Sequence, residues 1–190
     1  VPSYHSPDKK DYTSYRYPCP VDDSTVVAVK SGLKDINSLV TIVHGKEKRL
    51  SYIGSINSRL DYRNGKIYWT EIVPGLRWTH ENYSVLKCYD LKEGRIKSIT
   101  PRQRYLSPSV DKNGKVAAVS RTTVDGKNQL VLVELEDGKE LFAFQVPGNA
   151  FIKELTFTDQ DEVVAVAVTD AGISLLQFTP SSGQWEELLS

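Results

Sequence analysis

The chain has 190 residues, and its 24 lysines and arginines are balanced by 24 aspartates and glutamates. This length allows one domain with a buried core or an array of small repeated units, and the even charge balance excludes a global field that would attract nucleic acid or an anionic membrane. No stretch approaches the roughly 18 apolar residues that cross a bilayer, and residues 1–10 lack the sections of a signal peptide, so we expect no nucleic-acid partner and no direct membrane span.

The predicted elements are short β-strands throughout the chain. Apolar residues run in short β-branched stretches between turn signals such as Asn-Gly and Asp-Gly, and no longer segment keeps helical apolar spacing. The predicted strands are, in chain order, 16–20, 25–31, 38–43 and 48–53; 59–63, 66–73, 84–91 and 95–100; 105–110, 115–122, 129–135 and 141–146; and 155–159, 162–169, 173–178 and 184–189.

These strands recur as a unit. The apolar residues that open the second strands, Val26, Ile67, Val116 and Val163, lie 41, 49 and 47 residues apart. Four successive four-stranded antiparallel units predict an all-β fold, a β-propeller of about four blades. A pair of packed sandwiches is the alternative, and it is disfavoured because each unit leads into the next without the length of a Greek-key crossover.

We expect a single propeller-like domain over 1–190, either complete with four blades or part of a larger propeller. The absence of methionine favours a piece of a longer protein. The predicted blades cover 14–53, 59–100, 104–146 and 152–190.

The third unit resembles a known repeat. Its segments SPSVDKNGKVAAVS and NQLVLVELEDGKE are similar to the WD40-like (PD40-type) repeat of TolB-like bacterial propellers, although SVDKNG replaces the compact Ser-Pro-Asp-Gly of that motif. The resemblance implies an exported, noncatalytic propeller that binds proteins. IYWTE is close to the Tyr-Trp-Thr-Asp repeat of lipoprotein-receptor propellers, but it occurs once and ends in Glu71, which favours a chance match. The positions that fit the PD40-type motif are Asn113, Gly114, Lys115, Val116, Ala117 and Ser120.

Signatures of catalysis and metal binding are missing from the sequence. The three histidines, His5, His44 and His80, have no ligand spacing, and there is no G-x-S-x-G elbow or phosphate-binding loop. We therefore expect no catalytic residue, no metal and no cofactor. Cys19 and Cys88 are expected either as buried thiols or as a disulfide of an exported protein.

Several acidic residues are placed in predicted turns. Asp111 with Asn113, and Asp159 with Asp161, put oxygen atoms two residues apart, but neither loop continues into a calcium-binding pattern. A carbohydrate-active enzyme would need paired acids in a central funnel. We instead expect these acids to bond to their own turns. The acids that recur near the first strands are Asp22, Asp61, Asp111 and Asp159.

The long connection VPGLRWTHENYS, residues 73–84, is the main candidate for binding. Arg77, Trp78, His80 and Tyr83 are residue types that are enriched at protein interfaces, and loops carry function more often than the scaffold does. The alternative is that Trp78 and Tyr83 pack inward while Arg77 pairs with a carboxylate. Arg16 and Arg104, which match in the echo RYPCP and RYLSP, are expected to lie near the same face.

Together these features predict a noncatalytic protein-protein interaction module of an exported bacterial protein, in the periplasm or another extracytoplasmic location. The alternative is an accessory propeller that gates substrate for a peptidase or another hydrolase whose catalytic domain lies outside this chain. The partner is expected to be a protein or peptide, and a homodimer through open blade edges is possible because unpaired strand edges can associate.

Overall fold

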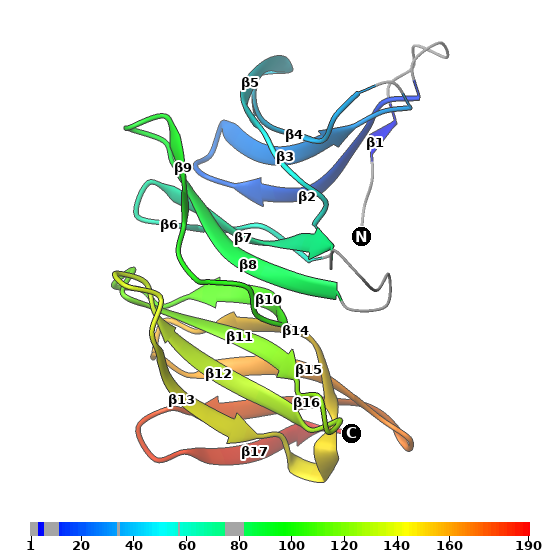
Figure 1. The fold of residues 1–190 in the computed structure, drawn as a ribbon, viewed down its shortest axis with the longest axis vertical. Helices are drawn as coiled ribbons and strands as arrows, with labels where there is room; N and C mark the ends of the chain where they lie inside the picture. The colour runs from blue at the N-terminus through cyan, green and yellow to red at the C-terminus, as the bar shows by residue number, and fades with distance from the viewer. Residues whose placement is uncertain (1–3, 6–11, 34, 57, 75–81) are drawn as a thin grey trace.

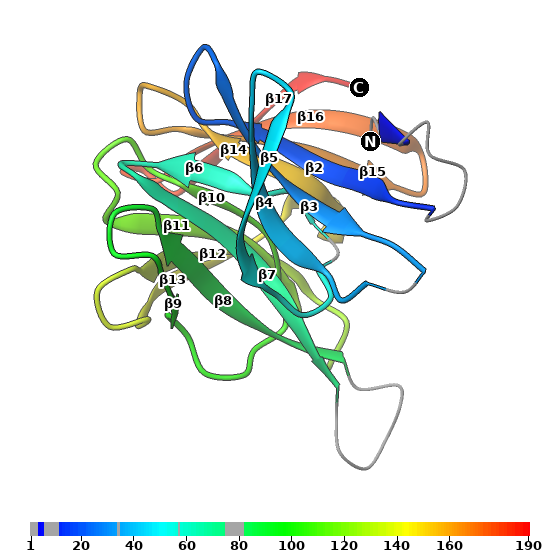
Figure 2. The same ribbon diagram turned by 90° about the horizontal axis from the view of Figure 1, so that it is seen from above.

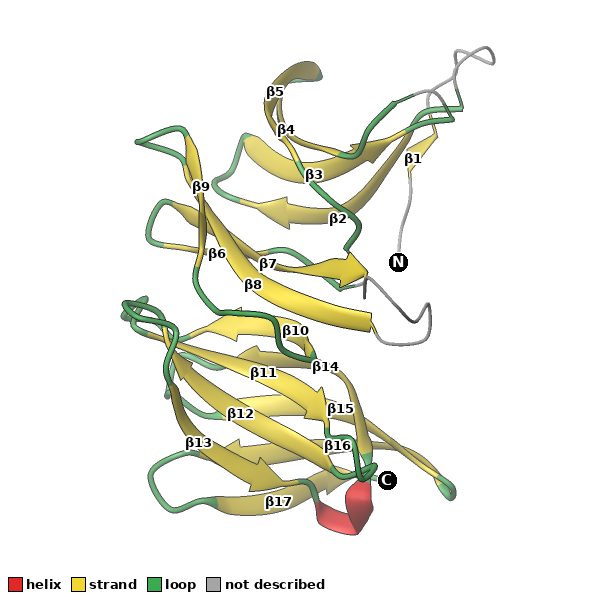
Figure 3. Cartoon of the chain, viewed as in Figure 1, coloured by secondary structure: helices red, strands yellow, loops and turns green. Residues whose placement is uncertain are grey.

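The structure, a computed structural model, describes residues 4–5, 12–33, 35–56, 58–74 and 82–190. Its strands form four antiparallel sheets, and the strands of each sheet follow one another in the chain (Figure 1). We call these sheets blades 1 to 4. The only helical element in the described ranges is a 3-10 turn, η1 (Pro147–Asn149), which is red in Figure 3. The predicted all-β propeller of four four-stranded blades is confirmed, with one short strand added to blade 1.

The strands within each blade pair in sequence order. The added strand, β1, pairs with β2 at the inner edge of blade 1. Blade 1 contains β1 (Tyr4–His5), β2 (Ser14–Pro20), β3 (Thr25–Ser31), β4 (Ser38–Val43) and β5 (Lys46–Tyr52); blade 2 contains β6 (Asp61–Arg63), β7 (Lys66–Pro74), β8 (Asn82–Asp90) and β9 (Arg95–Ser98); blade 3 contains β10 (Tyr105–Val110), β11 (Val116–Thr122), β12 (Asn128–Glu134) and β13 (Glu140–Gln145); and blade 4 contains β14 (Phe151–Phe157), β15 (Val163–Thr169), β16 (Gly172–Thr179) and β17 (Gln184–Leu189).

Three buried apolar clusters hold the blades together, one at each junction between neighbours. β-Branched and aromatic side chains from facing sheets interdigitate there, so each blade is stabilised mainly by burial against the next. The junction of blades 3 and 4 also contains an aromatic group in which the Phe178 ring lies 4.6 Å from that of Phe144 and 4.8 Å from that of Trp185. Fully buried residues include Val29, Leu39 and Trp69 between blades 1 and 2; Leu86, Val119 and Val131 between blades 2 and 3; and Leu130, Ala165 and Phe178 between blades 3 and 4.

Polar bonds add to these junctions along the first strands, which lie side by side. The Val110 N–H donates to Asp61 Oδ2 at 2.7 Å and joins blade 3 to blade 2. The Phe157 N–H donates to Ser109 Oγ at 3.1 Å and joins blade 4 to blade 3. At the junction of blades 2 and 3 and at the junction of blades 3 and 4, a side chain in the first strand of one blade therefore accepts a backbone hydrogen bond from the first strand of the next blade.

The similar segments RYPCP (16–20) and RYLSP (104–108) do not align in the structure as their shared Arg-Tyr pairs indicate. Tyr15 pairs with Lys30, and Tyr105 pairs with Arg121. Both first strands then bulge before a proline, at Tyr17 (φ 55°) and Ser107 (φ 49°). Tyr15 therefore corresponds to Tyr105, and Arg16 does not correspond to Arg104. The alignment of the two Arg-Tyr pairs was therefore wrong by two residues. The equivalent positions of the two strands are fixed by the bulge before the proline and not by the Arg-Tyr pair.

Candidate protein-binding surface

The connections between strands divide between two ends of the propeller. Because successive strands alternate in direction, the turns after the first and third strands lie at one end, which we call the hairpin end. The connections after the second and fourth strands lie at the other, which we call the loop end. In Figure 1 the turns of blades 2 to 4 lie on the left, and the starts of β8 and β12 lie on the right.

The two ends differ in their exposed side chains. At the loop end, Leu33, Ile36 and Val124 are 82%, 68% and 88% exposed in the connections after β3 and β11. Tyr12, just before the first strand of blade 1, is 74% exposed at the same end. The described turns of the hairpin end contain no exposed large apolar side chain, since they are built from residues such as Asp22, Lys92 and Asn113. Among the described connections between strands, exposed large apolar side chains therefore lie at the loop end.

The long connection singled out by the sequence belongs to this loop end. Arg77, Trp78 and His80 lie outside the described residues, so their roles stay predictions. Tyr83 is described, and it lies at the start of β8, where the connection rejoins blade 2.

Residues 101–104, which lead into blade 3, run beside the start of β8. The Ser84 and Gln103 backbones exchange hydrogen bonds at 2.6 and 2.8 Å, and Ser84 Oγ donates to the Tyr105 carbonyl oxygen at 2.6 Å. This clamp places the Arg104 guanidinium 5.8 Å from the centre of the Tyr83 ring, within the range of a cation–π interaction. Two of the predicted site residues are thus brought together at the base of the long connection.

Arg16 is not part of that pair. It lies within β2 of blade 1, half-buried, with its guanidinium 5.8 Å from the centre of the Tyr17 ring. Its Nε is buried without a hydrogen-bond partner in the described part of the chain. Because Arg16 and Arg104 belong to different blades and different register positions, the structure gives them no shared repeat role.

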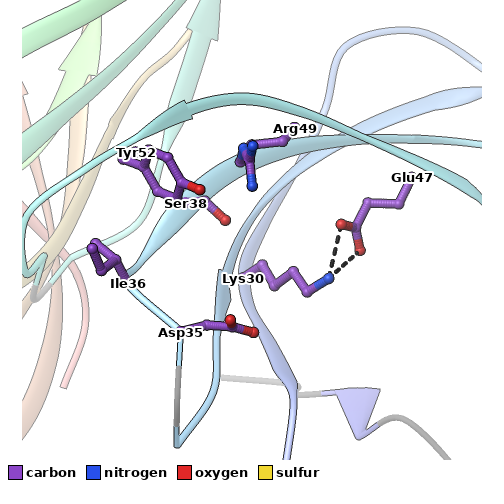
Figure 4. Close-up of a pocket in the computed structure, with 7 residues that line it drawn as sticks. All are labelled: Lys30, Asp35, Ile36, Ser38, Glu47, Arg49 and Tyr52. Atoms are coloured by element: carbon purple, nitrogen blue, oxygen red, sulfur yellow. Dashed lines mark hydrogen bonds and ion pairs between the residues drawn. The ribbon is translucent and has the colours of Figure 1, made fainter. Parts of the chain in front are cut away.

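A shallow pocket lies beside the loop end of blade 1, and Figure 4 shows its lining. Its volume of about 280 Å³ falls below the range of roughly 300–1,000 Å³ that is usual for small-molecule sites. The Lys30 ammonium binds Glu47 Oε1 at 2.9 Å, and the Arg49 guanidinium lies 4.4 Å from the centre of the Tyr52 ring. This charged, amphipathic lining suits a protein surface better than an enclosed ligand. The residues that line it are Lys30, Asp35, Ile36, Ser38, Glu47, Arg49 and Tyr52.

The ionisation of Glu47 is set by its partners in this pocket. Partial burial acts to raise its pKa, but the hydrogen bond from the Tyr15 hydroxyl at 2.5 Å and the ion pair with Lys30 outweigh that effect, so the pKa is lowered. Glu47 is therefore a carboxylate at neutral pH and holds the Lys30 side chain over the sheet.

A second pocket lies between the first strands of blades 1 and 2, around Cys19, Arg59 and Asp61. Asp61 was expected to bond within a turn, and this was wrong: it lies inside β6, is 8% exposed, and accepts its hydrogen bond from Val110 of blade 3. Burial raises its pKa, although Val110 and the nearby Arg59 and Arg63 act in the opposite direction. The role of Asp61 is to join blades.

Two of the other acids do bond within their turns. Asp22 Oδ1 accepts from the Ser24 and Thr25 backbones, and Asp111 Oδ1 accepts from the Lys115 and Val116 backbones. In the turn of Asp159 and Asp161, Thr158 Oγ1 accepts the backbone hydrogen bonds instead, and Asp161 pairs with Lys112 of the neighbouring blade at 2.8 Å. Over the described residues, no three His, Cys, Asp or Glu side chains converge as a metal site would require.

Both cysteines are free and buried, and they lie in different junctions. Burial, followed by the charge of Asp61, raises the pKa of the Cys19 thiol to about 11. Burial also raises the pKa of Cys88. Thiols with raised pKa values hold little thiolate at neutral pH and react slowly, so both residues act as small apolar side chains.

The raised pKa of Asp61 gives a pH-dependent prediction. A group whose pKa is higher in the folded protein favours folding below its unfolded pKa, and this contribution is lost as pH rises through the folded pKa. Asp61→Asn keeps an oxygen for the Val110 N–H and cannot ionise. We therefore expect the stability of Asp61→Asn relative to the wild type to increase as pH rises above about 4, as followed by urea unfolding at several pH values. A relative stability that falls over this range would mean that Arg59 and Arg63 stabilise the carboxylate more than burial destabilises it.

No protein-family model and no curated protein matches the sequence. Solved structures do match the fold. TolB from Acinetobacter baumannii superposes with a TM-score of 0.73 at 12% identity, over 92% of this chain and 43% of TolB.

The chain has the fold of a TolB-like β-propeller.

Two further matches have the same architecture. A structure of the nidogen–laminin complex gives a TM-score of 0.64 at 10% identity, over 91% of this chain and 64% of the matched chain. The β-propeller domain of the trilobed protease from Pyrococcus furiosus, described as having an open velcro topology, gives 0.60 at 13% identity, over 93% of this chain and 57% of that one. This TolB-like propeller thus spans less than two thirds of each matched chain. Among its described residues, no helix is long and apolar enough to cross a membrane.

Proposed function

We propose that this propeller is a noncatalytic module that binds another protein through its loop end. The observation that carries the proposal is the contrast between the ends: Leu33, Ile36 and Val124 are exposed at the loop end, whereas the described turns of the hairpin end are polar. Exposed apolar side chains beside a polar rim are typical of protein interfaces. The Tyr83–Arg104 pair supplies an aromatic ring and a planar cation at the same end, and both types are enriched among residues that dominate binding energy.

The similarity to TolB supports a bacterial protein that works outside the cytoplasm, in the periplasm or a comparable compartment. The nidogen–laminin match is a propeller fold observed in a protein complex, which agrees with a partner of protein nature.

The test is a double variant in the long connection. Arg77→Ala with Trp78→Ala is expected to reduce recovery of the bound protein by at least about tenfold, since hot-spot residues contribute about 2 kcal/mol or more each. The measurement is affinity capture from an extract of the source cells, quantified by mass spectrometry. Lys92→Ala with Glu93→Ala, in the β8–β9 turn at the hairpin end of the same blade, is the matched control and should bind as the wild type does.

Two outcomes would contradict this proposal. Equal recovery with both double variants would show that the long connection makes no contact with the partner. A loop variant that unfolds or aggregates, as seen by circular dichroism, would show that the connection serves packing.

The second candidate function is an accessory propeller that presents substrate to a hydrolase. The match to the propeller domain of the trilobed protease favours it. A peptidase or hydrolase domain encoded in the same polypeptide would select this function over the first.

A further inference from the structure

The strand pairing aligns the four blades residue by residue and reveals one leucine position that recurs in all of them. In each blade this leucine lies in the third strand and pairs with a residue near the middle of the second strand. We call the side of a blade that carries this leucine its following face, because in blades 1 to 3 it packs against the next blade. The recurring pairs are Val29 with Leu39, Thr70 with Leu86, Ser120 with Leu130, and Val166 with Leu175.

Three of these leucines are completely buried. Leu39, Leu86 and Leu130 are 0% exposed, each within the cluster that joins its blade to the next. Leu175 is only half-buried, because no described residue packs over blade 4 as a fifth blade would. The following face of blade 4 is therefore built like three buried faces but is open.

The side chains around Leu175 enlarge this open apolar surface. Val168 and Ile173 pair across β15 and β16 and are 36% and 64% exposed. Phe151 pairs with Val168 from the other side, and Leu189 pairs with Leu175; these two are 42% and 68% exposed. Contiguous exposed apolar surface of this kind marks an interaction site.

The opposite end of the array has a complementary surface. Each blade also has a preceding face, which in blades 2 to 4 packs against the previous blade. In blade 3 this face contains Tyr105, whose hydroxyl donates to Glu140 Oε2 at 2.9 Å, and Arg121, which binds the same carboxylate at 2.7 Å. Tyr105 belongs to the cluster that packs against Leu86 of blade 2.

Blade 1 repeats this arrangement at matching register positions. Tyr15 pairs with Lys30 as Tyr105 pairs with Arg121, and Glu47 accepts from Tyr15 at 2.5 Å and from Lys30 at 2.9 Å. The cation lies 5.9 Å from the tyrosine ring centre in both blades. The preceding face of blade 1 is thus built like a face that the chain already packs against a leucine-bearing neighbour.

We propose that the following face of blade 4 in one copy packs on the preceding face of blade 1 in a second copy, so that two chains join head to tail. Blades 1 and 4, which carry these faces, lie toward opposite ends of the long axis of the molecule (Figure 1). Two such contacts close a ring of eight blades, which is within the usual range for propellers, and a closed ring buries both faces of each copy.

Two further observations favour a second copy of the chain as the partner of these faces. The chain has no net charge, so copies do not repel one another. The edge strands β5 and β9 are rich in exposed charged residues, including Lys46, Lys48, Arg95 and Lys97, which disfavour pairing at these two edges. We therefore place the contact between copies on the blade faces and not on the blade edges that the sequence indicated. This inference does not depend on the function proposed for the loop end.

Figure 2, which looks along the long axis, shows the blades crossing one another at different angles, as the members of a twisted array do. The preceding face of blade 1 carries the pocket shown in Figure 4, and Lys30 and Glu47 line that pocket. We expect the apolar side chains around Leu175 of the second copy to cover this pocket.

The test is the molar mass of the full chain in solution, measured by light scattering after size exclusion. The wild type is expected at about twice 21.3 kDa. Ile173→Glu places a carboxylate on the following face and should weaken association at least tenfold, because an unpaired charge would be buried. Phe142→Glu, at an apolar residue of β13 that is 62% exposed and lies outside both faces and the loop end, is the matched control and should remain a dimer.

A mixing experiment tests the head-to-tail arrangement. Glu47→Lys alters the preceding face only, so the Glu47→Lys and Ile173→Glu chains each keep one intact face. We expect each to be monomeric alone and their mixture to form heterodimers through one restored contact. A monomeric wild type, a dimer that tolerates Ile173→Glu, or a mixture that stays monomeric would each overturn the proposal. Circular dichroism establishes that both variants are folded.

Discussion

Replacing Trp69 by alanine is expected to lower the free energy of unfolding by about 3–5 kcal/mol. Trp69 is 0% exposed and fills the junction of blades 1 and 2, together with Val29 and Leu39. Its Nε1 donates to Glu71 Oε2 at 3.3 Å, so truncation also removes a hydrogen bond from a carboxylate that binds Lys87. The loss combines the transfer of a large aromatic side chain with the cavity that remains.

The measurement is urea unfolding followed by circular dichroism. Trp185→Ala is the matched control, because Trp185 is partly exposed on the edge strand of blade 4 and should cost clearly less. Among the described residues, the buried cluster that holds blade 1 joins it to blade 2, so we expect the Trp69 variant to lose blade 1 before the other blades. A cost below about 1 kcal/mol would mean that the first junction is not packed around Trp69.

The second large effect is expected at Gly138, in the β12–β13 turn. A Cβ atom there would lie 2.0 Å from the Ile99 carbonyl oxygen of blade 2, and the backbone φ is +75°. Gly138→Ala thus adds a steric clash between blades to the strain of a left-handed conformation, and we expect destabilisation by about 3 kcal/mol or more.

Gly45 is a close control for this prediction. It has the same φ of +75° in the equivalent β4–β5 turn of blade 1, but nothing lies within 4 Å of an added Cβ. Gly45→Ala should therefore cost only the conformational strain, about 1 kcal/mol. If the two variants were equally stable in thermal or urea unfolding, the close approach of blade 3 to Ile99 would be refuted.

Much of the fold could be predicted from local patterns in the sequence. Asn64-Gly65 adopts positive φ values of 50° and 78° and closes the hairpin that an Asn-Gly pair predicts. Strand identity follows from β-branched runs such as residues 163–169, since their period and turns depend on local residues alone.

Features set by tertiary packing could not be predicted. The bulges at Tyr17 and Ser107 are equivalent, so Tyr17 lies at its bulge whereas Tyr105 lies two residues before the other one, an offset that the similar residue letters hide. Asp61 looks like other turn acids in the sequence, and only the approach of blade 3 shows that it bonds to Val110. The exposure of Leu33 and Val124 depends on which end of the propeller each connection occupies, although their place after a second strand was a usable signal.

The central claim, that a partner binds the loop end, is tested most directly by site-specific photo-crosslinking in the source cells. A photoreactive amino acid is placed at Val124 of the loop end or at Glu93 of the hairpin end, both of which are exposed. The account predicts an adduct with another protein from position 124 and none from position 93. Adducts of equal yield from both positions, or from position 93 alone, would contradict it.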